Sequence, residues 1–97
     1  MMSKIFNMNL TKYEKNADIF RALSHPIRLL VVYTLINKGP LNVSKLWSLL
    51  ELSQSEVSQH LFKLKSFKVV SYERKGREKY YRVDDPTVTR VIKTLEL

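Results

Sequence analysis

The chain contains no cysteine, which excludes disulfide bonds, thiolate metal sites and thiol catalysis. Glycine and proline are scarce, at two and three residues, and no low-complexity linker divides the sequence. The longest apolar run, residues 27–36, is interrupted by Arg28 and Thr34 and is too short to cross a bilayer. Residues 1–10 also lack the apolar stretch of a secretory signal. We therefore expect a cytoplasmic protein. We also expect no membrane partner at its surface, because the basic residues gather around Gly76 rather than on an amphipathic helix.

Acidic residues are in the minority, with nine Asp and Glu against seventeen Lys and Arg and a formal net charge of +8. The excess is concentrated between residues 54 and 82, where eight basic residues accompany three acidic ones. A local positive field of this kind attracts nucleic acid and anionic membranes, although a solvated lysine-rich surface would have the same composition. At 97 residues the chain supports one domain with a modest core.

Capping and turn residues divide the sequence into four helices, a β-hairpin and a closing helix. Residues 1–10 are expected to form an extension that is partly frayed, and residues 11–97 to form the domain. The first helix is predicted to start at the capping box Thr11–Glu14. The other predicted elements are helices over residues 27–37, 43–50 and 54–67, strands over residues 69–74 and 79–83, and a last helix over residues 86–97. Asn42 and Asp85 are expected to cap the helices that follow them. Residues 27–37 would also suit a buried strand, and only their length and flanking stops favour a helix.

The helices over residues 43–50 and 54–67 are close enough in sequence to form a helix-turn-helix. Ser53 and Glu56 form a capping box at the start of the second helix. An apolar stripe anchors that helix: Val57, Leu61 and Leu64. The opposite face carries Ser55, Gln59 and Phe62, flanked by Ser58 and Lys63. Short hydroxyl and amide side chains are poor for helix formation but suit the base edges of a major groove, while lysines suit phosphates.

The hairpin that follows has a strongly basic turn around Gly76. The basic residues are Arg74, Lys75, Arg77 and Lys79. We call this hairpin the wing. Its basic tip is suited to contact DNA phosphates or to enter a minor groove. A polar capped helix is often only a surface helix, and a basic hairpin often only aids solubility. Their succession in one short basic chain is more specific than either feature alone and corresponds to the winged-helix plan.

Two stretches carry a resemblance to the ArsR/SmtB family of winged-helix repressors: ALSHPIRLLVVYTL at residues 22–35 and LSQSEVSQHLFKLKSFKVVSYERKGREKYYRV at residues 52–83. The resemblance extends from about Lys12 to the last helix. It implies a mainly α fold with a β-hairpin wing, in the order α-α-α-α-β-β-α, and a homodimer joined by its first and last helices. It also implies double-stranded operator DNA as the partner, with recognition helices in successive major grooves.

By position, the resemblance assigns base contacts to Gln54, Ser55, Ser58 and Gln59. The apolar stripes of the first and last helices support dimerisation independently, because a core this small has little room for both. The expected interface residues are Tyr13, Phe20, Val88, Val91, Ile92 and Leu95. Two-fold symmetry would place the half-sites of a pseudo-palindromic operator about 34 Å apart.

The chain differs from the metal-sensing members of the ArsR/SmtB family in the residues that would bind a metal ion. Some members use thiolates, which this chain lacks, and others use Asp-x-His on the last helix, where this chain has Asp85-Pro86-Thr87. We therefore expect no metal and no other cofactor. His25 and His60 occupy structural positions of the family beside the recognition elements, and a phosphate contact stays open as an alternative for His60. Glu51 and the pair Phe67-Lys68 stand where glycines are common in the family, so a different local geometry and some backbone strain are expected at both turns.

The leading interpretation is a metal-independent, sequence-specific transcriptional regulator that represses by binding DNA. The alternative is a winged-helix module that binds another protein, as an antirepressor or adaptor, because fold does not fix function. Phe62 and Phe67 keep that alternative open, since exposed aromatic side chains anchor protein interfaces. An enzyme is not expected, because two dispersed histidines and the adjacent pair Asp84-Asp85 form no acid–base or nucleophile site.

Overall fold

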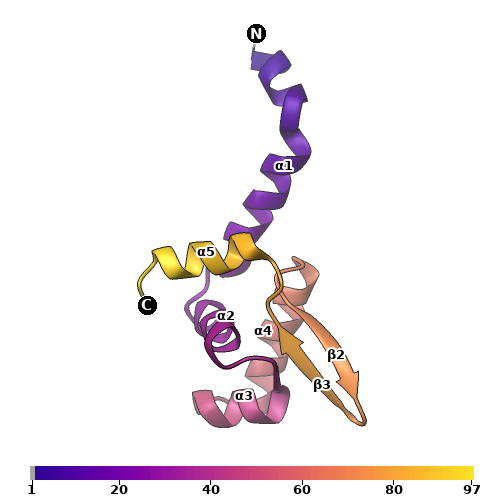
Figure 1. Cartoon of the computed structure of the whole chain (residues 1–97), viewed down its shortest axis with the longest axis vertical. Coiled ribbons are helices and arrows are strands. Elements are labelled where there is room, and N and C mark those ends of the chain that lie inside the picture. Colours follow the sequence, from indigo (N-terminus) through magenta and orange to yellow (C-terminus); the bar gives the residue numbers. More distant parts are fainter. Residues whose placement is uncertain (1) are drawn as a thin grey trace.

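In the computed structural model, which describes residues 2–97 and the side chains from Leu10 onward, the chain forms five helices and a three-stranded sheet (Figure 1). The elements are α1 Met2–Leu23, α2 Pro26–Lys38, β1 Leu41–Asn42, α3 Val43–Leu50, α4 Gln54–Ser66, β2 Ser71–Lys75, β3 Glu78–Arg82 and α5 Pro86–Thr94. The predicted order of four helices, a hairpin and a closing helix is confirmed. The ambiguous second segment is a helix.

Three predicted boundaries are wrong. Helix α1 begins at Met2 rather than Thr11, because no glycine or proline in residues 2–10 interrupts it. Strand β2 begins at Ser71, since Val69 and Val70 are buried in the core before the ladder starts. Helix α5 ends at Thr94 rather than at residue 97, and the backbone of Glu96 is left-handed, with φ 52°. The division into an extension and a domain stays a prediction.

Local capping starts most of the helices. The side chains of Asn42, Ser53 and Asp85 accept hydrogen bonds from backbone N–H groups at the starts of α3, α4 and α5, as predicted. Helix α2 starts differently, because the ring Nδ1 of His25 accepts a hydrogen bond from the N–H of Ile27 at 3.1 Å. An imidazole cap was not predicted.

The sheet contains a short strand that sequence patterning did not reveal. Its order is β1-β3-β2, all antiparallel, with Leu41 opposite Tyr81 and Tyr72 opposite Tyr81 on the other side. Two residues of strand carry no periodic pattern, so only tertiary pairing identifies β1. Because β1 leads directly into α3, this pairing ties the hairpin to the first helix of the helix-turn-helix.

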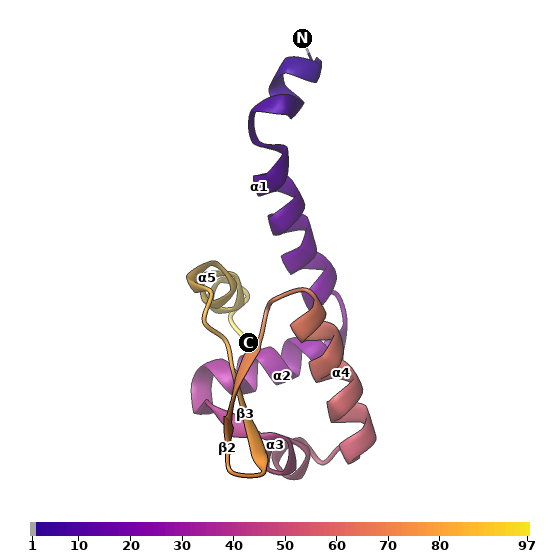
Figure 2. The same ribbon diagram turned by 90° about the vertical axis from the view of Figure 1, so that its right-hand side faces the viewer.

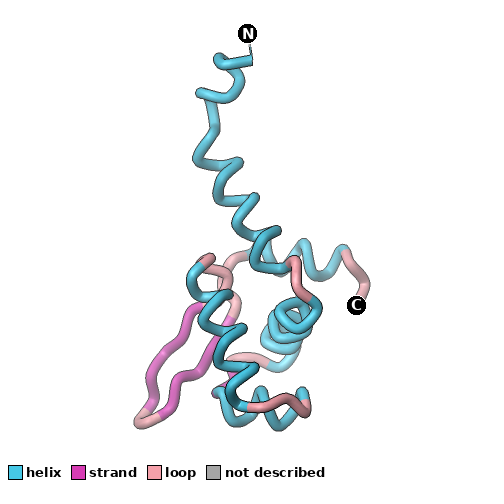
Figure 3. The backbone as a smooth tube through the Cα atoms, turned by 180° about the vertical axis from the view of Figure 1, so that it is seen from behind, coloured by secondary structure: helices cyan, strands magenta, loops and turns pink. Residues whose placement is uncertain are grey.

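The core is organised around α2, which lies in the middle of the molecule (Figure 2). Val31, Val32 and Leu35 of α2 are buried in an apolar cluster that also includes residues from every other helix. At the opposite extreme, the N-terminal half of α1 projects away from the rest of the chain (Figures 1 and 3). Within the described residues no single helix is long and apolar enough to cross a membrane. Two segments reach that length and apolarity only when taken together, Leu10–Leu23 and Pro26–Lys38, and they are bent by 102° at their junction.

Candidate nucleic-acid interface

The start of α4 is held by a reciprocal capping box. The hydroxyl of Ser53 accepts a hydrogen bond from the N–H of Glu56 at 3.1 Å. The carboxylate of Glu56 accepts from the N–H of Ser53 at 3.2 Å and from its hydroxyl at 3.1 Å. These bonds satisfy backbone donors at the helix start and occupy the only acidic side chain of α4. The first turn is therefore ordered by local contacts and leaves its other side chains free for a partner.

Helix α4 divides into a buried side and an exposed side. Val57, Leu61 and Leu64 are 0%, 1% and 0% exposed, so the predicted apolar anchor is confirmed. The four residues that we call the polar face of α4 are exposed: Gln54, Ser55, Ser58 and Gln59. None of these four forms a side-chain hydrogen bond with the part of the chain that the structure describes. Lys63 is also exposed, and its Nζ lies 5.3 Å from the ring centroid of Phe67.

The turns at either end of α4 use left-handed backbone at residues other than glycine. Glu51, between α3 and α4, has φ 55°, and its N–H donates to the carbonyl oxygen of Trp47. Lys68, after α4, has φ 62°, and its N–H donates to the carbonyl oxygen of Lys65 at 2.9 Å. Both positions keep the backbone conformation that glycine adopts most easily, so Glu51 and Lys68 are the residues where strain is expected. Phe67, the other residue of the pair after α4, has φ −89° and does not need glycine.

The wing carries positive charge that the rest of the chain does not neutralise. Arg74, Lys75 and Arg77 are exposed around Gly76, whose φ of 64° makes the turn. Among the described side chains these three form no ion pair. Arg82, at the base of the wing, is instead paired with Glu73 at 3.3 Å and with Asp84 at 2.9 Å. A hydrogen bond from the hydroxyl of Ser71, together with the pairing with Arg82 and against a smaller effect of burial, holds the pKa of Asp84 below its usual value.

Two contacts brace the wing against the helix-turn-helix. The carboxylate of Glu78 accepts from the side-chain amide of Asn42 at 2.6 Å, and Asn42 in turn caps α3. The ring of Tyr72 lies between two cations, with the Nζ of Lys65 at 5.3 Å and that of Lys79 at 4.7 Å. Lys79, expected as a free wing cation, is therefore partly engaged. Sequence reasoning missed Glu78 and Asn42 as a pair, because 36 residues separate them.

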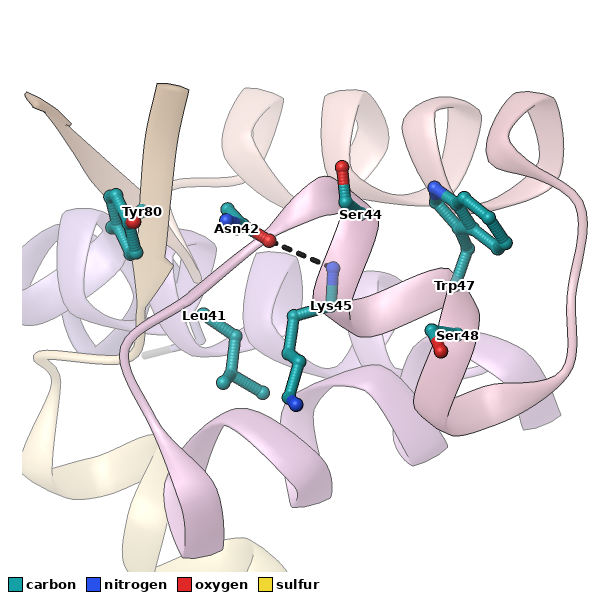
Figure 4. Close-up of a pocket in the computed structure, with 7 residues that line it drawn as sticks. All are labelled: Leu41, Asn42, Ser44, Lys45, Trp47, Ser48 and Tyr80. Carbon is teal, nitrogen blue, oxygen red and sulfur yellow. Dashed lines mark hydrogen bonds between the residues drawn. The ribbon is translucent and has the colours of Figure 1, made fainter. Parts of the chain in front are cut away.

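A groove of about 530 Å³ opens between α3 and the sheet (Figure 4). Its walls are mostly apolar, formed by Leu41, Trp47 and Tyr80. Lys45 is the charged residue in its lining, and its N–H donates to the side-chain oxygen of Asn42 (Figure 4). The groove therefore adjoins the brace between α3 and the wing, and no acid–base pair lines it.

The two histidines pack against each other beneath the recognition elements. Their ring centroids are 4.5 Å apart, and the Nδ1 of His25 is already used as the cap of α2. Burial, helped by the neighbouring His25 and Arg28 and opposed by Glu56, lowers the pKa of His60. Within the described residues no three His, Asp or Glu side chains gather to hold a metal ion. The contacts of the pair are those of a structural role.

The residues expected at a dimer interface divide into two groups. Tyr13 and Phe20 of α1 are 62% and 63% exposed, and Leu95 after α5 is 49% exposed. Val91 is half-buried. Val88 and Ile92, expected at the interface, are instead buried in the core at 0% and 3% exposed, so they hold α5 onto the chain itself. The core of this chain therefore buries part of the apolar stripe of α5 and leaves Leu95 exposed.

Related proteins share this arrangement. A family model described as bacterial regulatory protein, arsR family, matches residues 25–72. The transcriptional repressor PagR of Bacillus anthracis is 40% identical over 82 residues, which cover 84% of this chain and 82% of that protein. The arsenical resistance operon repressor of Bacillus subtilis is 34% identical over 83 residues, which cover 86% of this chain and 76% of that protein.

Solved structures agree on the fold. The crystal structure of PagR matches with a TM-score of 0.85 at 38% identity and covers 90% of this chain and 99% of that one. The winged helix-turn-helix DNA-binding domain of Mb0332 from Mycobacterium bovis matches with a TM-score of 0.79 at 24% identity, over 92% of this chain and 82% of that one. Helices α3 and α4 are therefore a helix-turn-helix, and β2 with β3 forms its wing.

Proposed function

Since the chain belongs to the ArsR family of bacterial regulatory proteins, we propose that it is a transcriptional repressor that binds a pseudo-palindromic operator as a homodimer. The observation that carries the proposal is the polar face of α4: four exposed side chains with no internal hydrogen-bond partner among the described residues, on a helix locked by its own cap. Amide and hydroxyl groups displayed in this way match the donors and acceptors of base edges in a major groove.

The wing would contribute affinity rather than sequence recognition. Arg74, Lys75 and Arg77 are exposed and free of ion pairs with other described residues, so they are available for phosphates. The brace between Glu78 and Asn42 would keep that charge at a fixed distance from the helix-turn-helix. Lys63, exposed near the end of α4, would add a further phosphate contact.

The dimer would form through α1 and the end of α5. Tyr13 and Phe20 are seven residues apart, so they share one face of α1, and both are largely exposed. Leu95 and the half-buried Val91 extend the apolar surface from α5. An isologous two-fold contact of this surface would space the two α4 helices by about one turn of DNA, ~34 Å.

The proposed repressor works without a metal cofactor. The sequence has no thiolate ligand, and the groups that could replace thiolates are engaged elsewhere: Asp85 caps α5 and His25 caps α2. Both histidines face each other rather than a third ligand. Release from DNA would therefore depend on a signal other than a metal ion.

The proposal is tested by selecting bound duplexes from a random DNA library with the full chain. The expected result is a pseudo-palindromic motif with half-site centres about one helical turn apart. A double variant, Gln54→Ala with Ser58→Ala, should enrich that motif weakly, while Asn37→Ala, an exposed amide on α2, should enrich it as the wild type does. Absence of any enriched sequence would contradict the proposal and favour the protein-binding alternative.

A further inference from the structure

Phe62 is an aromatic side chain that the fold does not use. It is 76% exposed, more than any other large hydrophobic residue among the described side chains. It lies outside the apolar cluster that packs the core, and its neighbour Lys63 covers the ring of Phe67 instead. Leaving a phenylalanine in water forgoes most of the free energy that its burial would supply. The exposed ring is therefore available for contact with a partner, and its place on α4 decides whether it is more than a singly exposed apolar residue.

The position of Phe62 on α4 indicates which partner. Ser55, Ser58, Gln59 and Phe62 are spaced i, i+3, i+4 and i+7, so they form one continuous face opposite the anchor of Val57, Leu61 and Leu64. Homeodomain recognition helices read DNA through four residues at the same spacing. At about 1.5 Å per residue, the face extends about 10 Å along the helix, which corresponds to about three base steps.

The chemistry of the major groove offers one apolar target to such a side chain. Among the four bases only thymine displays a methyl group there, and phenylalanine is one of the side chains that pack against it. A phosphate is not a suitable target, because the ring of phenylalanine has no hydrogen-bond donor and no charge. The exposed Lys63 and Lys65 that follow Phe62 in sequence favour a polyanion that also carries methyl groups, which is DNA.

We infer that Phe62 is a specificity-determining residue that packs against the C5-methyl group of a thymine in each operator half-site. The inference rests on the proposed function, because it requires α4 to enter a major groove. It adds an apolar contact to the polar face of α4. Truncation of Phe62 should relax the requirement for one thymine while it leaves the reading of other positions intact.

The test replaces each thymine of the selected duplex, one at a time, by deoxyuridine, which keeps base pairing and removes only the methyl group. Binding is measured for the wild type, for Phe62→Ala, and for Leu30→Ala as a matched control with an exposed apolar side chain on α2. At one symmetric position the wild type and Leu30→Ala should lose about fourfold in affinity per half-site, the worth of burying one methyl group. Phe62→Ala should bind the thymine and deoxyuridine duplexes equally.

Several other results would overturn the inference about Phe62, and they differ in whether the proposed function survives. Equal sensitivity of wild type and Phe62→Ala to deoxyuridine, or no sensitive thymine in the wild type, would overturn the inference and leave the proposed function standing. Loss of the dimer in Phe62→Ala, measured by sedimentation without DNA, would assign Phe62 to a protein contact and overturn it too. Failure to enrich any duplex would overturn the proposed function and this inference together. Thermal unfolding should be unchanged in Phe62→Ala, because the ring is exposed.

Discussion

Helix α4 and the wing follow each other along the chain, but their functional side chains are positioned by opposite means. The candidate DNA-contacting side chains of the polar face of α4 are uncharged and are positioned by the capping box from Ser53 to Glu56 and by a stripe of buried neighbours. Those of the wing are cations on a two-stranded hairpin, positioned by contacts to residues far away in sequence, such as Glu78 to Asn42. The proposed function gives these two regions different tasks: α4 would select the sequence, and the wing would supply salt-dependent affinity.

The largest expected effect comes from removing the charge of the wing. In the triple variant Arg74→Gln, Lys75→Gln, Arg77→Gln, three phosphate contacts are lost, so affinity at low salt should fall about a hundredfold. The slope of log affinity against log salt should fall by about one per contact. Titration of the selected operator over a range of salt concentrations measures both, with Lys38→Gln as an exposed control on α2. A wild-type slope in the triple variant would remove the wing from the interface.

Changes on the polar face of α4 should act differently. Gln54→Ala or Ser58→Ala should cost about 1–3 kcal/mol of specific binding for a lost bidentate contact, and less for a single polar contact. Neither residue is charged, so the salt slope should stay at its wild-type value. Competition between the operator and a scrambled duplex measures the loss. If operator affinity is unchanged in both variants, the assignment of these base contacts is wrong.

A smaller effect concerns the turn that joins α4 to the wing. Lys68 has φ 62°, a conformation that costs an L-residue free energy but not glycine. Lys68→Gly should therefore be more stable than Lys68→Ala by about 1 kcal/mol, and urea denaturation of the two variants measures this difference. The matched pair Lys45→Gly and Lys45→Ala, within α3, should show the reverse order. An Ala variant at position 68 as stable as the Gly variant would show that the turn is unstrained.

Metal ions should have no effect on either region. Neither α4 nor the wing carries a thiolate, and His60 of α4 packs against the ring of His25. Adding Zn²⁺, Cd²⁺ or Co²⁺ should leave operator affinity unchanged in a fluorescence titration, with a chelator as the control. Release from the operator at micromolar metal would refute the metal-independent mechanism.

The same contrast explains what the sequence predicted and what it did not. The caps at Asn42, Ser53 and Asp85 and the buried stripe of α4 depend on residues within one or two turns, and all of them were predicted correctly. The strand β1 and the bond between Asn42 and Glu78 depend on pairing across the chain, which no local pattern reveals. The imidazole cap at His25 was missed because histidine is not among the usual capping residues.

Helices α1 and α5 show two predictions from local sequence patterns that the structure does not bear out. A capping box at Thr11–Glu14 predicted a helix start, but the helix continues through it from Met2 because no residue before it stops the helix. On α5 the apolar stripe was predicted to face a partner, yet Val88 and Ile92 are buried within the chain. A stripe shows that a helix packs against something, and the tertiary fold decides whether that surface belongs to the same chain.

The division of labour between α4 and the wing is tested most directly by one ratio: the affinity for the selected operator divided by the affinity for a scrambled duplex at one salt concentration. In Gln54→Ala with Ser58→Ala this ratio should fall, because the loss is confined to the operator. In the triple wing variant both affinities should fall together and the ratio should stay at its wild-type value. A ratio that falls in the wing variant and is unchanged in the α4 variant would contradict the account.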